Sequence, residues 1–424
     1  MHSRRRFVVS MLLVLTMVLG AAMAVHAAEL WHYWLTGGEK AALDALLEAA
    51  REVYPEYEFT ERGIPGATAE IRRQLGAAFM AGDPPEVYQS AIGYDLKTYV
   101  DAGRLKPLDE VWEKINGDEI FDDGLKAMVK FDGHAYAIPL NTHVISHMFY
   151  NKHVFAELGL EPPKDWDEFK EVCRVLRENG IEPIAAVAGS WGTYQWYGPL
   201  LTVLGVDGYL ALGRGEIAFT DPRVREAFEL YRDTMVEAYM EGWAGYGWAE
   251  AANEMIQGNA AMYLNGDWVV AHFKEAGLEE DVDFGFFPVP GTQDVVIIQV
   301  DALAAPVGSA DEAGANALME VAGRLEGQIA FNSLKGSVAA NLNVPPDIYG
   351  PTLRCVYERI QEVNQSGTVL PNLLFMLPPH LWQELTRQVE IFTLDPTDAT
   401  LDTVLQTLEN LRLEILFENG FVQW

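Results

Sequence analysis

One lysine stands alone among uncharged residues in the stretch FNSLKGSVAA, residues 331–340. The order Lys335-Gly336-Ser337 does not fit a phosphate-binding loop, which needs a glycine at a fixed upstream spacing and then Gly-Lys-Ser/Thr. Two serine-nucleophile motifs fail as well, because Ala188 replaces the first glycine of G-x-S-x-G and Asn332 replaces the serine of S-x-x-K. Another use for Lys335 is therefore needed.

Two acidic residues stand equally alone among apolar neighbours, Asp267 in YLNGDWVV and Asp301 in IIQVDALAAP. An unpaired buried carboxylate is costly, so each needs hydrogen-bond or charged partners. A carboxylate and an ammonium around one polyol would form charge-assisted hydrogen bonds to a neutral ligand. We therefore interpret Lys335 as a donor that orients a ligand, with a purely structural ion pair to aspartate as the alternative.

Six tryptophans fall in loops or at element ends beside Gly, Asn, Asp or Gln, and an indole face can pack on the C–H face of a sugar. They are Trp34, Trp191, Trp196, Trp243, Trp248 and Trp268. Any one of them alone is more typical of a core residue, but the set favours carbohydrate binding.

Histidine spacing gives no metal motif. His143 and His147 are four residues apart, but their segment is expected to be extended, and no glutamate of an H-E-x-x-H pattern stands between them. His153 has no such partner either. We expect neither a metal nor a cofactor.

The elements that must position these residues alternate between strands and helices, which predicts an α/β fold with parallel strands. Expected strands include AELWHYWL and YEFTERG, and expected helices include residues 37–56 and the segment that Asp165 would cap. After a strand at 181–190, we expect helices until Asp281. The stretch around Pro139, then His143 to Tyr150, and the strand-rich stretch 281–308 are expected to carry the chain between two lobes.

We expect one lobe to comprise residues 28–141 and 293–336 and the other residues 142–292 and 337–424. About 400 residues with 49% hydrophobic composition favour two domains over one. A chain that crosses more than once forms a hinge, with a ligand between the lobes.

Residues 1–27 resemble an export signal, with a basic start, an apolar run and small residues ending at Ala27. SRRRFVV is also similar to a twin-arginine signal, and an uncleaved anchor is the alternative to removal. Exported proteins can form disulfides, but the chain has only Cys173 and Cys355, and the sequence leaves their pairing open.

The formal net charge is −32, with 62 acidic residues against 30 Lys and Arg. So negative a surface repels nucleic acids and anionic membranes. We therefore expect that the ligand is not a polyanion and that the protein does not bind nucleic acid.

Several stretches together are similar to family 1 of the extracellular solute-binding proteins, the sugar-capturing components of bacterial ABC importers. They are GDPPEVYQS, GHAYAIPLNTH, PPKDWDEF, FTDPRVREAFE, MIQGNAAMYLNGDW and NSLKGSVAA. Within that family the chain most resembles the branch that binds glucose, galactose or mannose. The resemblance implies a type II periplasmic-binding-protein fold, two hinged α/β lobes and a membrane permease as partner, and free delivery of the ligand suggests a monomer.

The resemblance also implies which residues bind the sugar. Its tryptophan positions, which stack on the ring, correspond to Trp34, Trp191 and Trp248, and its hydrogen-bonding positions correspond to Glu39, Gln89, His143, Asp301 and Lys335. Asp267 matches a Gly-Asp-Trp turn of the family and is a further candidate.

The chain departs from that branch at three places. Leu35 replaces a second aromatic residue, Ala91 replaces a histidine, and Pro371 or Asn372 stands where another histidine is usual. These changes leave the sugar open, and a disaccharide could use the freed space.

Two functions of different classes explain these residues. One is a binding protein that hands an unaltered sugar to a permease. The alternative is a secreted glycoside hydrolase that uses two of Glu39, Asp267 and Asp301. Lys335 and Gln89 favour the first, because a hydrolase has no need of them.

Overall fold

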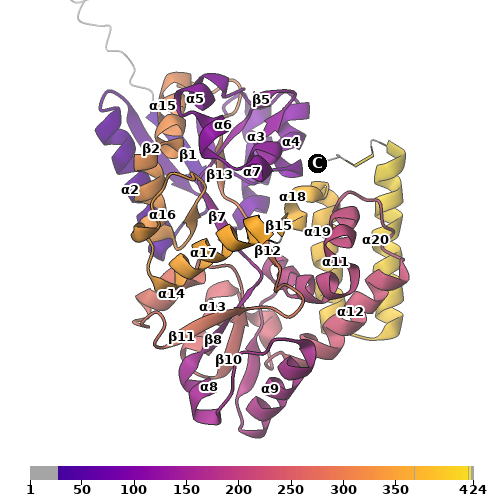
Figure 1. Cartoon of the computed structure of the whole chain (residues 1–424). Coiled ribbons are helices and arrows are strands. Elements are labelled where there is room, and N and C mark those ends of the chain that lie inside the picture. The colour runs from indigo at the N-terminus through magenta and orange to yellow at the C-terminus, as the bar shows by residue number, and fades with distance from the viewer. Residues whose placement is uncertain (1–26, 367, 419, 422–424) are drawn as a thin grey trace, which may run out of the picture.

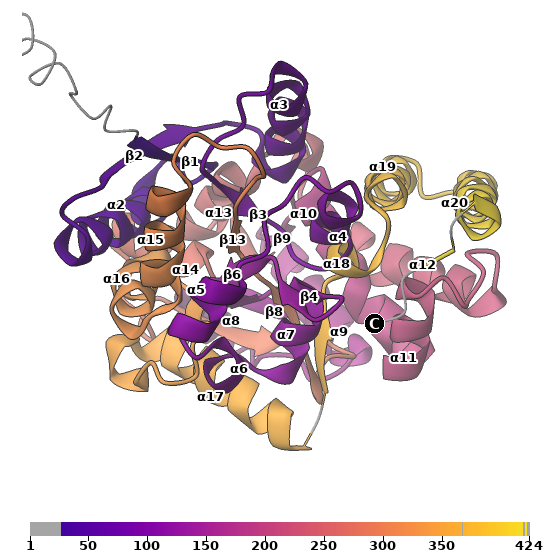
Figure 2. The same cartoon turned by 90° about the horizontal axis from the view of Figure 1, so that it is seen from above.

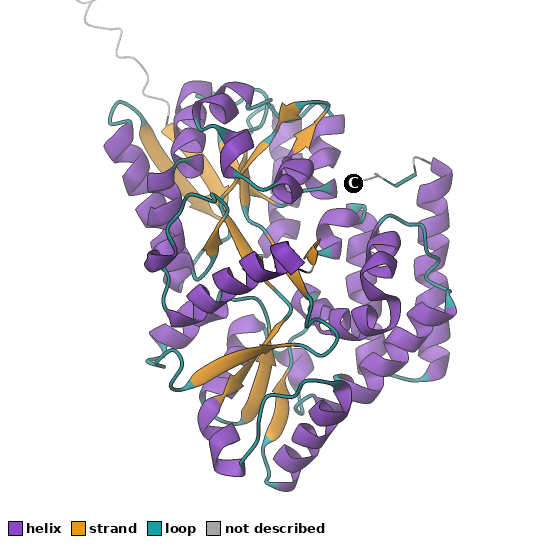
Figure 3. Ribbon diagram, in the orientation of Figure 1, coloured by secondary structure: helices purple, strands orange, loops and turns teal. Residues whose placement is uncertain are grey.

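The computed structural model describes residues 27–366, 368–418 and 420–421. Two sheets build the two halves of the molecule, and a third lies between them (Figures 1 and 3). The expected two-lobed α/β fold is confirmed. The expected export signal lies outside the described residues except for Ala27, which begins the first strand.

The first sheet has the order β2 (Glu58–Gly63), β1 (Ala27–His32), β3 (Val87–Ser90), β13 (Ala302–Ala304) and β6 (Ala137–Pro139). Strand β1 is parallel to both of its neighbours, as the alternation of strands and helices predicts. Strand β13 runs antiparallel to β3 and β6, so the sheet is mixed.

Helices pack on this sheet because each presents an apolar stripe. Helix α2 (Gly37–Val53) buries Leu43, Leu46 and Leu47 and contacts α15 (Glu312–Gly323) and α16 (Leu325–Lys335). Figure 2 shows these three helices gathered on one side of the molecule. The other elements of this half are α3 (Ala67–Ala81), α4 (Tyr94–Asp101), α5 (Asp109–Lys114), α6 (Gly117–Ile120), α7 (Asp123–Val129), β4 (Lys130–Phe131) and β5 (His134–Ala135).

The second sheet has the order β11 (Phe284–Pro288), β8 (His147–Asn151), β10 (Ala260–Leu264) and β9 (Glu182–Ala185). The expectation of helices alone between β9 and Asp281 is wrong, because AAMYL forms β10 and pairs with both β8 and β9. Asp165 does cap its helix, α9 (Trp166–Glu178), by accepting a hydrogen bond from the backbone N–H of Glu168. The other helices that pack around this sheet are α8 (Lys152–Leu158), α13 (Trp248–Ile256) and α14 (Val269–Glu275).

The third sheet joins the halves and has the order β14 (Val338–Ala339), β7 (Asn141–Val144), β12 (Val295–Gln299) and β15 (Thr368–Pro371). Leu140 links β6 to β7, and Ile145 and Ser146 link β7 to β8, so the segment expected to be one strand from His143 to Tyr150 is divided between two sheets. All four residues of β7 are buried although three of them are polar. The polar crossing therefore needs partners inside the protein.

The remaining helices and 3₁₀ turns flank this crossing, and several of the helices form the right-hand side of the molecule in Figure 1. They are α10 (Ser190–Thr193), a 3₁₀ turn at Tyr194–Trp196, α11 (Tyr197–Gly213), α12 (Pro222–Thr234), 3₁₀ turns at Val236–Ala238, Trp243–Gly245 and Pro346–Ile348, α17 (Pro351–Ser366), α18 (Leu373–Met376), α19 (Pro379–Leu394) and α20 (Asp398–Glu418). Both cysteines are free thiols, Cys173 buried and Cys355 exposed. Within the described part of the chain, every helix is too short or too polar to cross a bilayer.

Candidate functional site

Four polar side chains gather where the chain crosses between the halves. His143 of β7 lies directly opposite Gln299 of β12 in an antiparallel pair, so both side chains point to the same face of the sheet. Asn141 lies two residues before His143 on β7, Asp301 lies two residues beyond Gln299, just past the end of β12, and Asn141 Nδ2 donates to Asp301 Oδ2 over 2.9 Å. Strand register alone thus assembles a polar patch between the two lobes.

Asp301 is the principal acceptor of this patch. Its carboxylate accepts from Gln89 Nε2 at 3.0 Å and from Tyr33 Oη at 3.4 Å, and Lys335 Nζ lies 3.9 Å away. Burial raises the pKa of Asp301, but His143, whose Nε2 lies 3.6 Å from Oδ2, and the charge of Lys335 outweigh it and hold that pKa well below its usual range. Asp301 is therefore an ionised acceptor at neutral pH.

Lys335 ends α16 and reaches the same patch. Gly336, at φ 79°, takes the left-handed conformation that ends the helix there. The ammonium donates to Glu39 Oε1 over 2.7 Å and lies 3.3 Å from His143 Nε2. Burial lowers the pKa of Lys335, but the carboxylates of Glu39 and Asp301 raise it by more than burial lowers it. The net pKa is above its usual value, so the ammonium keeps its charge.

His143 connects the lysine to Asp267. Its Nε2 faces two donors, Asn141 Nδ2 at 3.2 Å and Lys335 Nζ, so in the neutral ring the proton lies on Nδ1. The amide of Asn141 cannot be reversed, because its Oδ1 accepts from the backbone N–H of Asp301. Burial lowers the pKa of His143, and the carboxylate of Asp267 raises it above its usual value.

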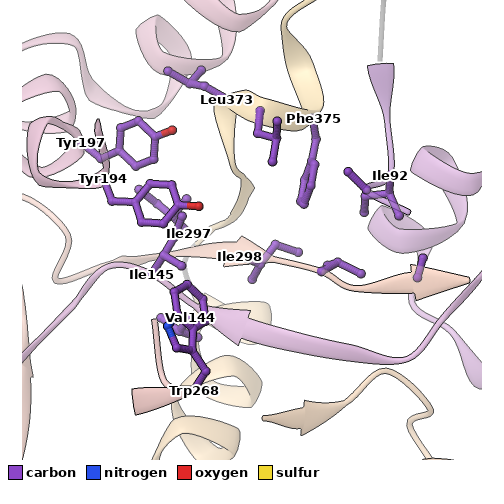
Figure 4. Close-up of a cluster of buried hydrophobic side chains, with 14 of the residues drawn as sticks. Ile92, Val144, Ile145, Tyr194, Tyr197, Trp268, Ile297, Ile298, Leu373 and Phe375 are labelled. Carbon is purple, nitrogen blue, oxygen red and sulfur yellow. The ribbon is translucent and has the colours of Figure 1, made fainter. Parts of the chain in front are cut away.

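Asp267 holds this ring from behind. One of its oxygens bonds His143 Nδ1 and the other accepts from the backbone N–H of Val144 over 3.1 Å, and the residue is fully buried. Trp268 follows it and packs edge-on against the ring of His143, with centroids 5.0 Å apart. Figure 4 shows Trp268 beside Val144. The geometry of Asp267 is that of a group that positions His143.

The structure therefore brings together six of the nine residues expected from the sequence: Glu39, Gln89, His143, Asp267, Asp301 and Lys335.

The other three expected residues, all tryptophans, lie outside this polar patch. Trp34 is fully buried, with its ring 5.0 Å from that of Phe331 and 6.0 Å from that of His32. Trp191 in α10 and Trp248, which packs edge-on against His272, are half-buried. Their roles as stacking faces stay predictions.

Other residues of the patch escaped sequence reasoning: Tyr33, Asn141, Tyr194 and Gln299. Tyr194 belongs here because the charge of Asp301 contributes to the rise of its pKa, behind the larger effect of burial. In Figure 4 its hydroxyl points the same way as that of Tyr197, toward the segment that carries Leu373 and Phe375. The alternation Asn141-x-His143 in β7 and Gln299-x-Asp301 at the end of its partner β12 is the signal that could have found two of them.

These groups suit the binding of a polar neutral molecule. In residues 27–366, 368–418 and 420–421, no group of three or more His, Cys, Asp or Glu side chains could hold a metal ion. A glycoside hydrolase needs one carboxylic acid whose pKa is raised so that it can donate a proton. Asp301 has the opposite shift, and both oxygens of Asp267 are already bonded.

The sequence is similar to those of known solute-binding proteins. A model of the bacterial extracellular solute-binding proteins matches residues 40–329. The chain is 32% identical to an uncharacterized ABC transporter extracellular-binding protein of Pyrococcus horikoshii, over 82% of this chain and 78% of that one. It is 29% identical to a probable sugar-binding periplasmic protein of Rhizobium meliloti, over 83% of this chain and 85% of that one.

The fold also has close likenesses among solved structures. A bacterial solute receptor described as having an exclusive preference for β-D-galactopyranose superposes with a TM-score of 0.81. The two chains share 23% sequence identity, over 92% of this chain and 99% of that one.

Proposed function

The chain belongs to the family of bacterial extracellular solute-binding proteins, and we propose that it captures a neutral sugar between its two lobes and delivers it to the permease of an ABC transporter. Members of this family are binding proteins and not enzymes, so the hydrolase alternative is set aside. Its relatives are periplasmic or extracellular proteins, and the location expected from the N-terminal sequence is confirmed.

One observation supports a sugar most directly. The polar patch between the lobes combines an ionised acceptor, Asp301, with an ammonium donor, Lys335, and with the amide of Gln89. Alternating donors and acceptors of this kind match hydroxyl groups, each of which donates one hydrogen bond and accepts others. A relative at 29% identity carries a sugar-binding name, which agrees with this chemistry.

The finer parts of the proposal concern the lobes and the ligand. We assign residues 28–141 and 293–336 to one lobe and residues 142–292 and 337–424 to the other, which places the third sheet at the hinge. The residues proposed to contact the sugar are Trp34, Glu39, Gln89, His143, Trp191, Trp248, Asp301 and Lys335, with Asp267 behind His143. The sugar is a monosaccharide such as glucose, galactose or mannose, and the protein acts as a monomer.

A thermal-shift panel tests the class of ligand. A millimolar sugar with a micromolar dissociation constant stabilises the folded protein by about 4 kcal/mol, which raises the melting temperature visibly. D-glucose, D-galactose, D-mannose, D-xylose and maltose form the panel, with mannitol at equal concentration as the control for osmolyte effects. A rise with one sugar alone supports the proposal, and equal curves with all six compounds contradict it.

A further inference from the structure

Gln299 occupies a special place in the polar patch. It lies opposite His143, two residues before Asp301, and only 9% of its surface is exposed. Its Oε1 accepts a hydrogen bond of 2.8 Å from Nδ2 of Asn372. The direction of the Gln299 amide therefore depends on how Asn372 is held.

Asn372 is held firmly by two donors. Its Oδ1 accepts from Tyr197 Oη at 2.6 Å and from the backbone N–H of Leu374 at 3.1 Å. The backbone N–H of Leu374 can only donate, so the atom of Asn372 that meets it must be the oxygen. The nitrogen of Asn372 must then face Gln299, and the atom of Gln299 that meets it must be Oε1.

The amide nitrogen of Gln299 is thereby turned away from Asn372. Within the described residues it takes part in no hydrogen bond, although it belongs to a nearly buried side chain. Among the described residues this nitrogen is not one of the fully buried polar atoms without a partner, so it remains accessible to solvent and free to donate to an acceptor from outside the protein. The neighbouring groups of the patch already bond one another through Asn141, His143, Asp301 and Lys335.

We propose that Gln299 is a specificity-determining residue whose amide N–H groups donate to a hydroxyl oxygen of the bound sugar, with Asn372 as the positioning residue that fixes this direction. The inference rests on the proposed function, because it needs a hydroxylated ligand between the lobes. A sugar without oxygen at the matching ring position leaves the amide unpaired and binds less tightly.

Isothermal titration calorimetry tests this with the panel sugar that binds the unmodified protein most tightly and with its monodeoxy derivatives. Gln299→Met keeps the volume of the side chain and removes the donor, so affinity for the parent sugar should fall about tenfold. One monodeoxy sugar should bind the unmodified protein about as weakly as the parent sugar binds Gln299→Met. Gln299→Met itself should bind this deoxy sugar and the parent sugar with equal affinity. Gln406→Ala, at an exposed position in α20, is the control and should bind as the unmodified protein does.

Asn372→Asp tests the positioning role. It keeps the acceptor for Tyr197 and Leu374 but presents an oxygen to Gln299, which must then turn its nitrogen toward that oxygen. The donor toward the sugar is lost, so affinity should fall by a similar factor, and adding Gln299→Met to this variant should weaken binding little further.

The outcomes separate the two proposals. If no panel sugar binds the unmodified protein, the proposed function fails. If a sugar binds and Gln299→Met, shown to be folded by its melting curve, binds the parent and every deoxy sugar with unchanged affinity, the role of Gln299 alone is overturned.

Discussion

Each buried charge near the crossing strands has a partner of opposite sign or an oriented dipole beside it. Lys335 lies among Glu39, Asp301 and His143, so it serves the protein as an ion-pair partner whether or not it also touches a ligand. Both interpretations offered by the sequence can therefore hold at once. The role of Lys335 as an ion-pair partner can be tested separately, because it should contribute to the free energy of unfolding.

Lys335→Met should lower the free energy of unfolding by about 3 kcal/mol, because it leaves the carboxylates of Asp301 and Glu39 without their cation. Urea unfolding at pH 7 measures this effect. Lys170→Met, at an exposed position in α9, is the control and should change stability little. Equal effects of the two substitutions would assign Lys335 no structural role.

His147 gives a separate test that involves pH. Its ring is buried against Phe286, with centroids 4.5 Å apart, and neither nitrogen has a partner among the described residues. Burial, assisted by the charge of Arg359, lowers the pKa of His147 to about 3. The unfolded chain, with a pKa near 6.5, therefore binds this proton more readily, and stability is lost as pH falls from about 6.5 toward 3.

His147→Phe should flatten this acid limb. Between pH 6.5 and pH 4 the unmodified protein should lose about 3 kcal/mol more than the variant does, at about 1.4 kcal/mol per pH unit. Urea unfolding at several pH values gives the comparison, with His380→Phe at an exposed position as control. Parallel pH profiles for His147→Phe and the unmodified protein would show that the ring is not buried in solution.

At this scale the sequence predicted the charged members of the patch but missed most of the neutral ones. Asp267, Asp301 and Lys335 stand out because a lone charge in an apolar stretch must find partners. Asn141 and Gln299 do not, because their importance arises from the pairing of β7 with β12, two strands that lie far apart in the sequence. Trp34 had the sequence context of a loop residue, yet a neighbouring Phe331 from α16 covers it.

At the scale of elements, a close approach of helices joins the two halves beside the site. A side-chain carbon at Gly38, in the first turn of α2, would lie 2.8 Å from Cβ of Ala271 in α14. One at Gly336 would lie 3.4 Å from the same atom. The absence of side chains at both glycines thus lets α14 lie against α2 and the end of α16, next to Glu39 and Lys335.

Ala271→Leu should hold the halves apart, because the added carbons have no space between these glycines. We expect at least tenfold weaker sugar binding and a smaller contraction on binding, measured by calorimetry and small-angle X-ray scattering. Ala276→Leu makes the same change at an exposed position at the end of α14 and should preserve both. Identical behaviour of the two variants would mean that α14 does not limit closure.

Element types were predictable where a period or a cap was clear, as for α2 and for α9 with Asp165 at its start. Strand β10 was missed because AAMYL is a short apolar run, which has no period that separates strand from helix. The division of β7 from β8 was also missed, because the sheet to which each strand belongs is decided by tertiary pairing and not by local sequence.

At the scale of the whole molecule, the net charge of −32 should leave binding of the ligand unaffected if the ligand is neutral. The dissociation constant for the panel sugar should stay within about twofold between 50 mM and 500 mM NaCl, because salt screens interactions between charges alone. Titration calorimetry across this range is the measurement. Affinity that falls steeply with salt would point instead to a cationic ligand.

Calorimetry with the sugar panel, followed by mass spectrometry of the recovered ligand, tests the central claim most directly. The account predicts that one sugar binds with one-to-one stoichiometry and a dissociation constant near the micromolar range, and that the sugar is recovered chemically unaltered. No heat with any panel sugar, or recovery of cleaved products, would contradict it.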